Sequence, residues 1–254
     1  MLKPALLLFL LLCLLPVPCA QGAAGRPADR KELTTLDMPE WIIEFSNLPS
    51  KQREQYLQNF SKAKLAYQKG EWVVSYSALA DCEMIFKDNP NVWNLRACCL
   101  MEQKFLDEAA AELEKARRAL PHDPVTELNV ANLHLASGRY KESLEIIDSL
   151  MPGLQDTSPA ELIDVLIFRK VLALVLMNRI DEAEKLVRHL NALSDTPLYY
   201  YSRAAICMAE GRKPEALRSL RVVQSIFAKG NSLIPYQRAF ELSRLAESAR
   251  QTPH

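Results

Sequence analysis

The side chains of this sequence that could act on a substrate or bind a metal are scattered rather than grouped. The four histidines lie on separate segments, and no cysteine pair has the C-x-x-C spacing of a zinc site. Neither a glycine-rich phosphate loop nor a Gly-x-Ser-x-Gly elbow occurs. Carboxylates such as Glu108 and Glu112 lie near bases such as Lys115, a spacing typical of ion pairs on a solvated helix. We therefore expect a non-catalytic protein with no catalytic residue, no metal ligand and no cofactor.

The composition favours a helical protein without an electrostatic preference for a charged partner. The chain has 254 residues, in which Lys plus Arg and Asp plus Glu both number 31, so the formal net charge is zero. This balance gives no reason to expect binding to nucleic acid. Glycine is scarce, with 7 residues, and Ala, Leu, Glu, Lys and Arg are abundant, which favours a nearly all-helical fold.

Residues 1–22 have the layout of a secretory signal peptide. Lys3 precedes an unbroken apolar run, Ala5–Leu15, which is too short to span a bilayer comfortably. Cleavage after Gly22, with Ala20 two residues earlier, fits the small-x-small rule. We therefore expect an exported protein, periplasmic or secreted.

A lipid anchor is the alternative at this end of the chain. Cys19 could carry the lipid and attach the protein to a membrane, although Pro18 is a poor residue just before a lipidated cysteine. Residues 23–37 are small and polar, and we predict a flexible linker there.

The cysteines after the signal peptide allow two interpretations. Cys98 and Cys99 are adjacent, so on a helix they point about 100° apart and cannot share one role. Either each cysteine, including Cys82 and Cys207, fills a slot for a small apolar residue, or Cys82 forms a disulfide with Cys98 or Cys99. An exported protein would permit the disulfide.

A repeating unit organises the rest of the chain. In the stretch Asn91–Pro121, a tryptophan and small residues follow helical spacing, then a second helical pattern ends at the proline. The same unit recurs at 34-residue steps, interrupted once by the insertion Ser158–Ile163. We place the five units at residues 56–89, 90–123, 124–157, 164–196 and 197–228. The turn inside each unit carries Gly70, Gly138, Asn178 or Gly211, residues that tolerate a left-handed backbone, but Lys104 in the second unit.

These spacings resemble the tetratricopeptide-repeat family. The resemblance implies an all-α fold, a right-handed α-solenoid of about five helix pairs over residues 56–233, whose concave face is built from the first helix of each pair. Residues 38–55 would form an N-terminal helical segment that covers the first repeat or folds into the groove. Residues 234–254 would form a C-terminal capping helix and tail, with a polar outer face.

In this family the concave groove binds a peptide or helix of a protein partner. The family's groove positions in the last three units are mostly apolar here, and two asparagines are placed to pair with a partner's backbone. The predicted partner-binding residues are Asn94, Leu128, Asn132, Leu135, Phe168, Leu172, Val175, Tyr201 and Met208. Alternatively, the array's curvature, the N-terminal segment or the C-terminal helix buries these side chains. Because Lys64 is the one basic groove residue among the carried-over positions, the carboxylate clamp of chaperone-binding members is not expected.

The sequence thus predicts an exported scaffold that binds a protein partner in its concave groove. The alternative is a lipid-anchored outer-membrane accessory lipoprotein that aids assembly of a secretion, pilus or outer-membrane complex. Lipidation at Cys19 would favour the second function, and cleavage after Gly22 the first. Neither prediction names the partner or fixes the oligomeric state.

Overall fold

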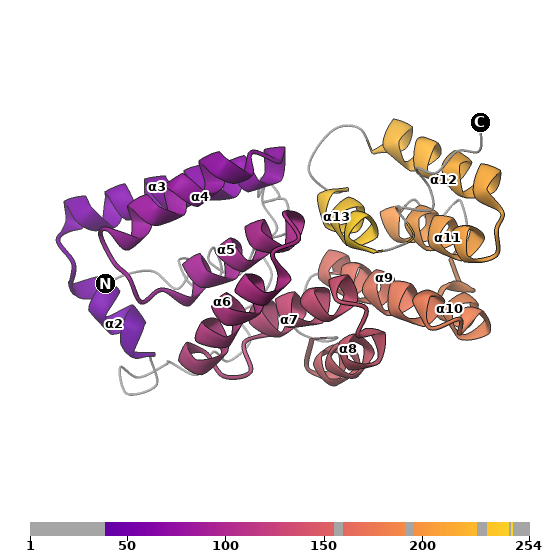
Figure 1. Ribbon diagram of the computed structural model, residues 1–254, viewed down its shortest axis with the longest axis horizontal. Helices are drawn as coiled ribbons and strands as arrows, with labels where there is room; N and C mark the ends of the chain where they lie inside the picture. The colour runs from indigo at the N-terminus through magenta and orange to yellow at the C-terminus, as the bar shows by residue number, and fades with distance from the viewer. Residues whose placement is uncertain (1–38, 155–159, 191–195, 228–232, 244, 246–254) are drawn as a thin grey trace, which may run out of the picture.

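The fold consists of stacked helix hairpins. The computed structural model describes residues 39–154, 160–190, 196–227, 233–243 and 245, and in this part of the chain twelve α-helices form and no strand does. The predicted signal peptide, linker, Cys19 and C-terminal tail lie outside the described residues and stay predictions. Figure 1 shows the helices as an elongated array with the N-terminal pairs at one end and the C-terminal pairs at the other.

Ten helices form five consecutive pairs, which confirms the all-α solenoid. The pairs are α3 (Ser50–Lys69) with α4 (Trp72–Glu83), α5 (Pro90–Glu102) with α6 (Leu106–Ala119), α7 (Pro124–Ala136) with α8 (Tyr140–Leu154), α9 (Ala160–Leu176) with α10 (Ile180–Val187), and α11 (Pro197–Ala209) with α12 (Lys213–Ile226). Two further helices flank them, α2 (Glu40–Asn47) before the pairs and α13 (Ile234–Leu242) after them.

Three of the first helices begin at a proline. Pro90, Pro124 and Pro197 occupy the first turns of α5, α7 and α11, at the predicted starts of three units. Proline suits this position because its ring presets the helical φ and an amide there would lack a partner in the helix. The fourth pair differs, since the described part of the predicted insertion, residues 160–163, extends α9 at its start.

The turn inside each pair takes a left-handed residue at the predicted position. Gly70 has φ +78°, and Lys104 adopts φ +67° although it carries a side chain. The second turn is closed by the amide of Phe105, which donates to the carbonyl of Leu100 at 3.0 Å. This hydrogen bond runs from a residue to the carbonyl five positions earlier, and it commonly closes a helix that ends with a left-handed residue.

Small side chains let the helices approach closely. The alanines at the eighth position of four units are 0% exposed, as the repeat pattern predicts; they are Ala63, Ala97, Ala131 and Ala204. Among the described helices, none is long and apolar enough to cross a membrane.

Helix α2 lies against the first pair. The ring of Phe45 packs edge-on against Tyr56 of α3 at 4.9 Å between centroids and against Phe86, beyond α4, at 5.7 Å. This position agrees with a segment that covers the first repeat, rather than one that folds into the groove.

Helix α13 does not lie where the sequence pattern places it. We expected a cap on the last pair, but α13 contacts the first helices of three pairs, α7, α9 and α11 (Figure 1). The helix ends at Leu242, and Ser243 is extended. The physical reason for its position is the fit of its apolar face: Tyr236, Ala239 and Phe240 are all 5% exposed or less, and the Tyr236 ring packs against Phe168 of α9 and Tyr201 of α11.

The helix thereby joins two hydrophobic cores. Tyr236 and Phe240 belong to the core of the C-terminal pairs, built around α9 and α11. Leu242 packs against the core of the N-terminal pairs, built around α3 to α6. Figure 1 shows α13 between these two halves of the array.

The four described cysteines are buried thiols that form no disulfide. The thiol of Cys82 donates to the carbonyl of Tyr56 at 3.7 Å, and that of Cys99 donates to Ser75 Oγ at 3.3 Å. The disulfide between Cys82 and a neighbour is therefore contradicted, because each thiol fills a separate site in the packing between helices.

Candidate functional site

The concave face of the array is the candidate site, and it is already covered. The nine residues predicted to bind a partner lie on α5, α7, α9 and α11, and each is 9% exposed or less. Phe168 and Leu172 are 0% exposed, and Met208 has the largest value. The alternative prediction, in which other parts of the same chain bury these side chains, therefore describes this structure.

Aromatic rings of α13 form one contact with the face. The Tyr236 ring lies 5.4 Å from that of Phe168 and stacks on that of Tyr201 at 5.5 Å. Phe240 meets Tyr201 edge-on at 6.3 Å. Such ring pairs add roughly 0.5–1.5 kcal/mol each beyond the area that they bury. Two of the predicted binding residues, Phe168 and Tyr201, thus hold a helix, and that helix belongs to the same chain.

A charged contact lies on the other side of α13. The Arg238 guanidinium stands over the Trp72 ring, 4.6 Å from its centroid, and its Nε lies 3.7 Å from Glu102 Oε1. The Tyr67 hydroxyl donates to the same carboxylate oxygen at 3.4 Å. The contact joins α13 to the ends of α3 and α5 and the start of α4, so it belongs to the N-terminal half of the array.

Burial changes the acidity of this carboxylate. The Glu102 side chain is 7% exposed. Its removal from water raises its pKa to about 7, against the opposing effect of Arg238. Glu241 raises the pKa of Glu102 further, whereas Lys104 and the Tyr67 hydroxyl lower it.

The two predicted asparagines are engaged inside the array. Asn94 donates to Thr126 Oγ1 at 2.9 Å and accepts from Asn129 Nδ2 at 3.2 Å, which ties α5 to α7. Asn132 accepts from Arg169 Nε at 2.5 Å, which ties α7 to α9. Their amides bind neighbouring first helices instead of facing a free groove.

Arg169 is an unexpected member of the covered face. Its side chain is buried, and burial lowers its pKa to about 10, so it stays charged at neutral pH. It lines a small cavity of about 10 Å³ with Tyr67, Asn132 and Arg238, beneath α13. That volume corresponds to about one water molecule, so α13 fits the face closely.

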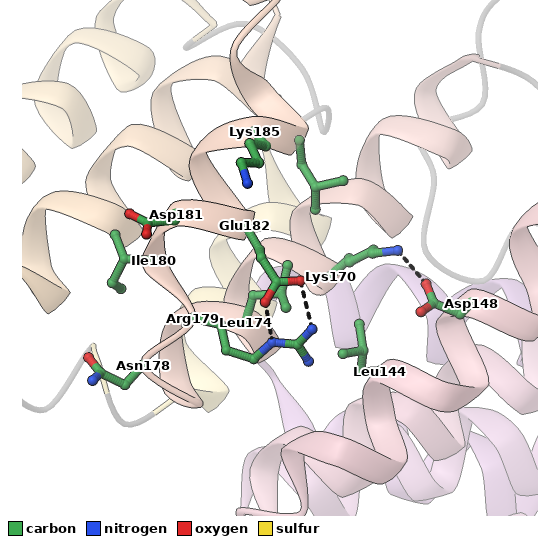
Figure 2. Close-up of a pocket in the computed structure, with 11 residues that line it drawn as sticks. Leu144, Asp148, Lys170, Leu174, Asn178, Arg179, Ile180, Asp181, Glu182 and Lys185 are labelled. Atoms are coloured by element: carbon green, nitrogen blue, oxygen red, sulfur yellow. Dashed lines mark hydrogen bonds and ion pairs between the residues drawn. The ribbon is translucent and has the colours of Figure 1, made fainter.

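A larger hollow lies elsewhere, between α8, α9 and α10. It has a volume of about 760 Å³, and Figure 1 shows α8 and α13 on opposite sides of α9. Lys170 pairs with Asp148 at 2.5 Å, and Arg179 pairs with Glu182 at 2.7 Å. Figure 2 shows these two ion pairs among the residues that line the hollow. Because these charges satisfy one another, they do not favour a ligand of either sign.

Sequence reasoning missed the contacts that α13 makes. Arg238 belongs to the helix for which a polar outer face was predicted, and Arg169 is not among the groove positions carried over from the repeat family. Arg169 left a signal in the sequence. Arg169 interrupts the apolar run of α9, LIFRKVLALVL, where an exposed arginine would be out of place.

The fold defines a class of protein: an all-α solenoid of stacked helix pairs. A family model described as tetratricopeptide repeat matches residues 100–162, from the end of α5 to the start of α9. The pairs on both sides continue the register predicted from the sequence, and this fold suggests a protein–protein interaction scaffold.

One solved structure aligns with most of the chain. It is the crystal structure of the TPR domain of P58(IPK), with 13% sequence identity and a TM-score of 0.33. The alignment covers 84% of this chain and 74% of the other. Among curated proteins, no sequence matches this chain.

Proposed function

We propose that the protein is a non-catalytic protein–protein interaction scaffold whose concave face binds an amphipathic helix of a partner, in the place that α13 occupies. The observation that carries this proposal is the seating of α13 itself. A short helix with aromatic side chains on one face and a basic side chain on another already fills the face. The face therefore has the shape and chemistry to hold a helix.

The binding mode follows that of a helix in a groove. Tyr236 and Phe240, four residues apart, bury their rings against α9 and α11, while Gln237 between them faces solvent. Recognition of this kind depends on anchors that recur at helical spacing, with polar residues between them. A partner segment with the same pattern would make the same contacts.

Covalent attachment gives α13 an advantage over any partner. A helix held on the same chain competes at an effective concentration on the order of 1 mM. The resting protein is thus closed, and a partner binds when it outcompetes α13 or when α13 is released.

A peptide-binding experiment tests this function. The probe is a fluorescent peptide of residues 233–243, titrated with the full chain while its anisotropy is followed. The released variant, a full chain that carries Tyr236→Ala and Phe240→Ala, has lost both aromatic anchors of α13. We expect it to bind the peptide at least about tenfold more tightly than wild type does. A full chain with Gln237→Ala is the matched control, because that exposed side chain lies on the same helix.

One outcome of this experiment supports the proposed function and another refutes it. Tight binding by the released variant and weak binding by wild type and the control support the proposal. If the released variant is folded by circular dichroism and shows no saturable binding, the concave face is a closed structural core and the proposed function is wrong.

We also propose that the scaffold is exported, which rests on the sequence of residues 1–22. The basic start, the apolar run and the small residues before Ala23 support it. The lipid-anchored accessory lipoprotein is the second candidate, and Cys19 supports it. The intact mass of the protein purified from its native cells decides: a chain that begins at Ala23 supports export with cleavage, and a lipid adduct at Cys19 supports the anchored form.

A further inference from the structure

The contact around Arg238 is built from two parts of the chain, residues 67–72 and the end of α5. Tyr67 comes from the last turn of α3, Trp72 from the first residue of α4, and Glu102 from the last residue of α5. Gly70, in the turn between α3 and α4, completes the site. A Cβ placed at Gly70 would lie 3.5 Å from Arg238 Nη2, so this turn passes beside the guanidinium and a side chain there would touch it.

The chemistry of these groups suits a guanidinium in particular. The Trp72 ring offers a face on which a planar cation can stack, and Tyr67 packs against that ring at 5.4 Å and fixes its position. Glu102 offers a carboxylate oxygen at the edge of the cation. Arginine meets both demands at once because its charge is planar and spread over several donors, whereas the compact ammonium of lysine does not stack in the same way.

The site also needs its cation. With the Glu102 side chain 7% exposed, water cannot solvate the carboxylate fully. A buried carboxylate that loses its counter-ion is costly, and it then favours the protonated form. Any helix that replaces α13 on this face therefore binds better if it brings a positive charge to Glu102.

We propose that Trp72, Glu102 and the Gly70 turn form a guanidinium subsite of the concave face, and that the partner helix carries an arginine in the register of Arg238. This inference rests on the proposed function and names the chemistry of its partner. It describes an amphipathic helix with two aromatic anchors four residues apart and an arginine between them, two residues after the first. The subsite thus selects a basic helix, not an acidic peptide.

The test uses three peptides of residues 233–243 and three full-chain proteins. The peptides carry the native arginine, Arg238→Lys or Arg238→Gln. The proteins are the released variant alone, the same variant with Glu102→Gln, and the same variant with Glu108→Gln. Glu108 is an exposed carboxylate of α6 and serves as the matched control.

We expect the released variant to bind the glutamine peptide about tenfold more weakly than the arginine peptide, and the lysine peptide with intermediate affinity. The Glu102→Gln substitution should reduce the tenfold preference to about twofold, and Glu108→Gln should preserve it. Equal binding of the arginine and glutamine peptides by the released variant would overturn the subsite while leaving the proposed function intact. Absence of binding by any peptide would instead refute the proposed function, and the subsite with it.

Hydrogen exchange in the otherwise wild-type chain provides a second measurement, which does not depend on the folding of the released variant. Glu102→Gln should raise the exchange rate of the α13 amides severalfold, and Glu108→Gln should leave it unchanged. Unchanged exchange of α13 in the Glu102→Gln chain would mean that this contact does not hold the helix, and the subsite would be rejected.

Discussion

Glu102 is a carboxylate that folding removes from water, and its burial makes stability depend on pH. Its pKa of about 7 in the folded protein lies above the ordinary value of 4.5, so between these values the folded chain holds a proton that the unfolded chain has lost. The contribution of Glu102 to the free energy of unfolding is therefore largest below pH 4.5 and falls as pH rises to about 7. The fall is on the order of 3 kcal/mol at most.

Comparison with Glu102→Gln isolates this effect, because glutamine does not titrate. We expect the free energy of unfolding of wild type, measured in urea relative to this variant, to decrease steadily from pH 4.5 to 7. Tyr67, Lys104, Arg238 and Glu241 face the carboxylate and set the size of the decrease. A difference that is constant over this range, or that grows with pH, would show that Glu102 is not buried as a carboxylate.

Lys104 has a strained, left-handed backbone conformation at the turn between α5 and α6. It holds φ at +67°, where three other units place glycine. We expect Lys104→Gly to stabilise the protein by roughly 0.5–1 kcal/mol, because glycine adopts a left-handed conformation without strain. The control is Lys62→Gly in the middle of α3, which should destabilise by about 1 kcal/mol. Thermal melts of both variants give the signs, and a destabilised Lys104→Gly chain would contradict the argument.

For single residues, the sequence predicted the features that depend on spacing within the repeat. The buried alanines at the eighth position and the left-handed turn residues follow from a pattern of 34 residues, and both are found. The pairing of Glu102 with Arg238 was not predictable in the same way. Those residues lie on separate helices far apart in the sequence, and no periodicity relates them.

At the scale of elements, the sequence pattern predicts that α13 is a helix but not which surface it packs against. Its spacing predicts an amphipathic helix, and a helix forms. An end cap and a helix in the groove both need an apolar face, so the pattern alone does not separate them. The decision rests on the match between the rings of α13 and those of Phe168 and Tyr201, which requires the folded surface of α9 and α11.

Phe168 tests whether the concave face is closed. It was predicted as an exposed anchor for a partner, yet it is 0% exposed and contacts Tyr201 and Tyr236. Phe168→Ala should therefore cost about 3–5 kcal/mol of stability. Phe105→Ala is the matched control, because that ring is 50% exposed and its loss should cost well under about 1 kcal/mol. Chemical denaturation of both variants checks this, and equal losses would mean that the face is open in solution.

At the scale of the whole molecule, α13 connects two cores that otherwise meet through neighbouring pairs. Tyr236 and Phe240 lie in the C-terminal core, and Leu242 packs on the N-terminal one. A repeat array without such a link behaves as a row of units that interact with their nearest neighbours. The helix adds a contact between units that are not neighbours, and it should make unfolding more cooperative.

The released variant allows this to be measured. We expect its urea transition to be broader, with a lower slope of free energy against denaturant concentration, because the two halves then unfold less cooperatively. The Gln237→Ala chain should keep the wild-type slope. A variant whose midpoint falls while its slope stays unchanged would show that α13 adds stability without coupling the halves.

The most direct test of the account is hydrogen exchange of α13 in the wild-type chain, with and without the peptide of residues 233–243 in excess. If the concave face is a helix-binding site that α13 occupies, the amides of α13 are protected in the protein alone. The peptide should then accelerate their exchange, while the amides of α7, α9 and α11 stay protected. Exchange of α13 at the rate of an unfolded peptide before any addition, or bound peptide with no acceleration, would contradict the account.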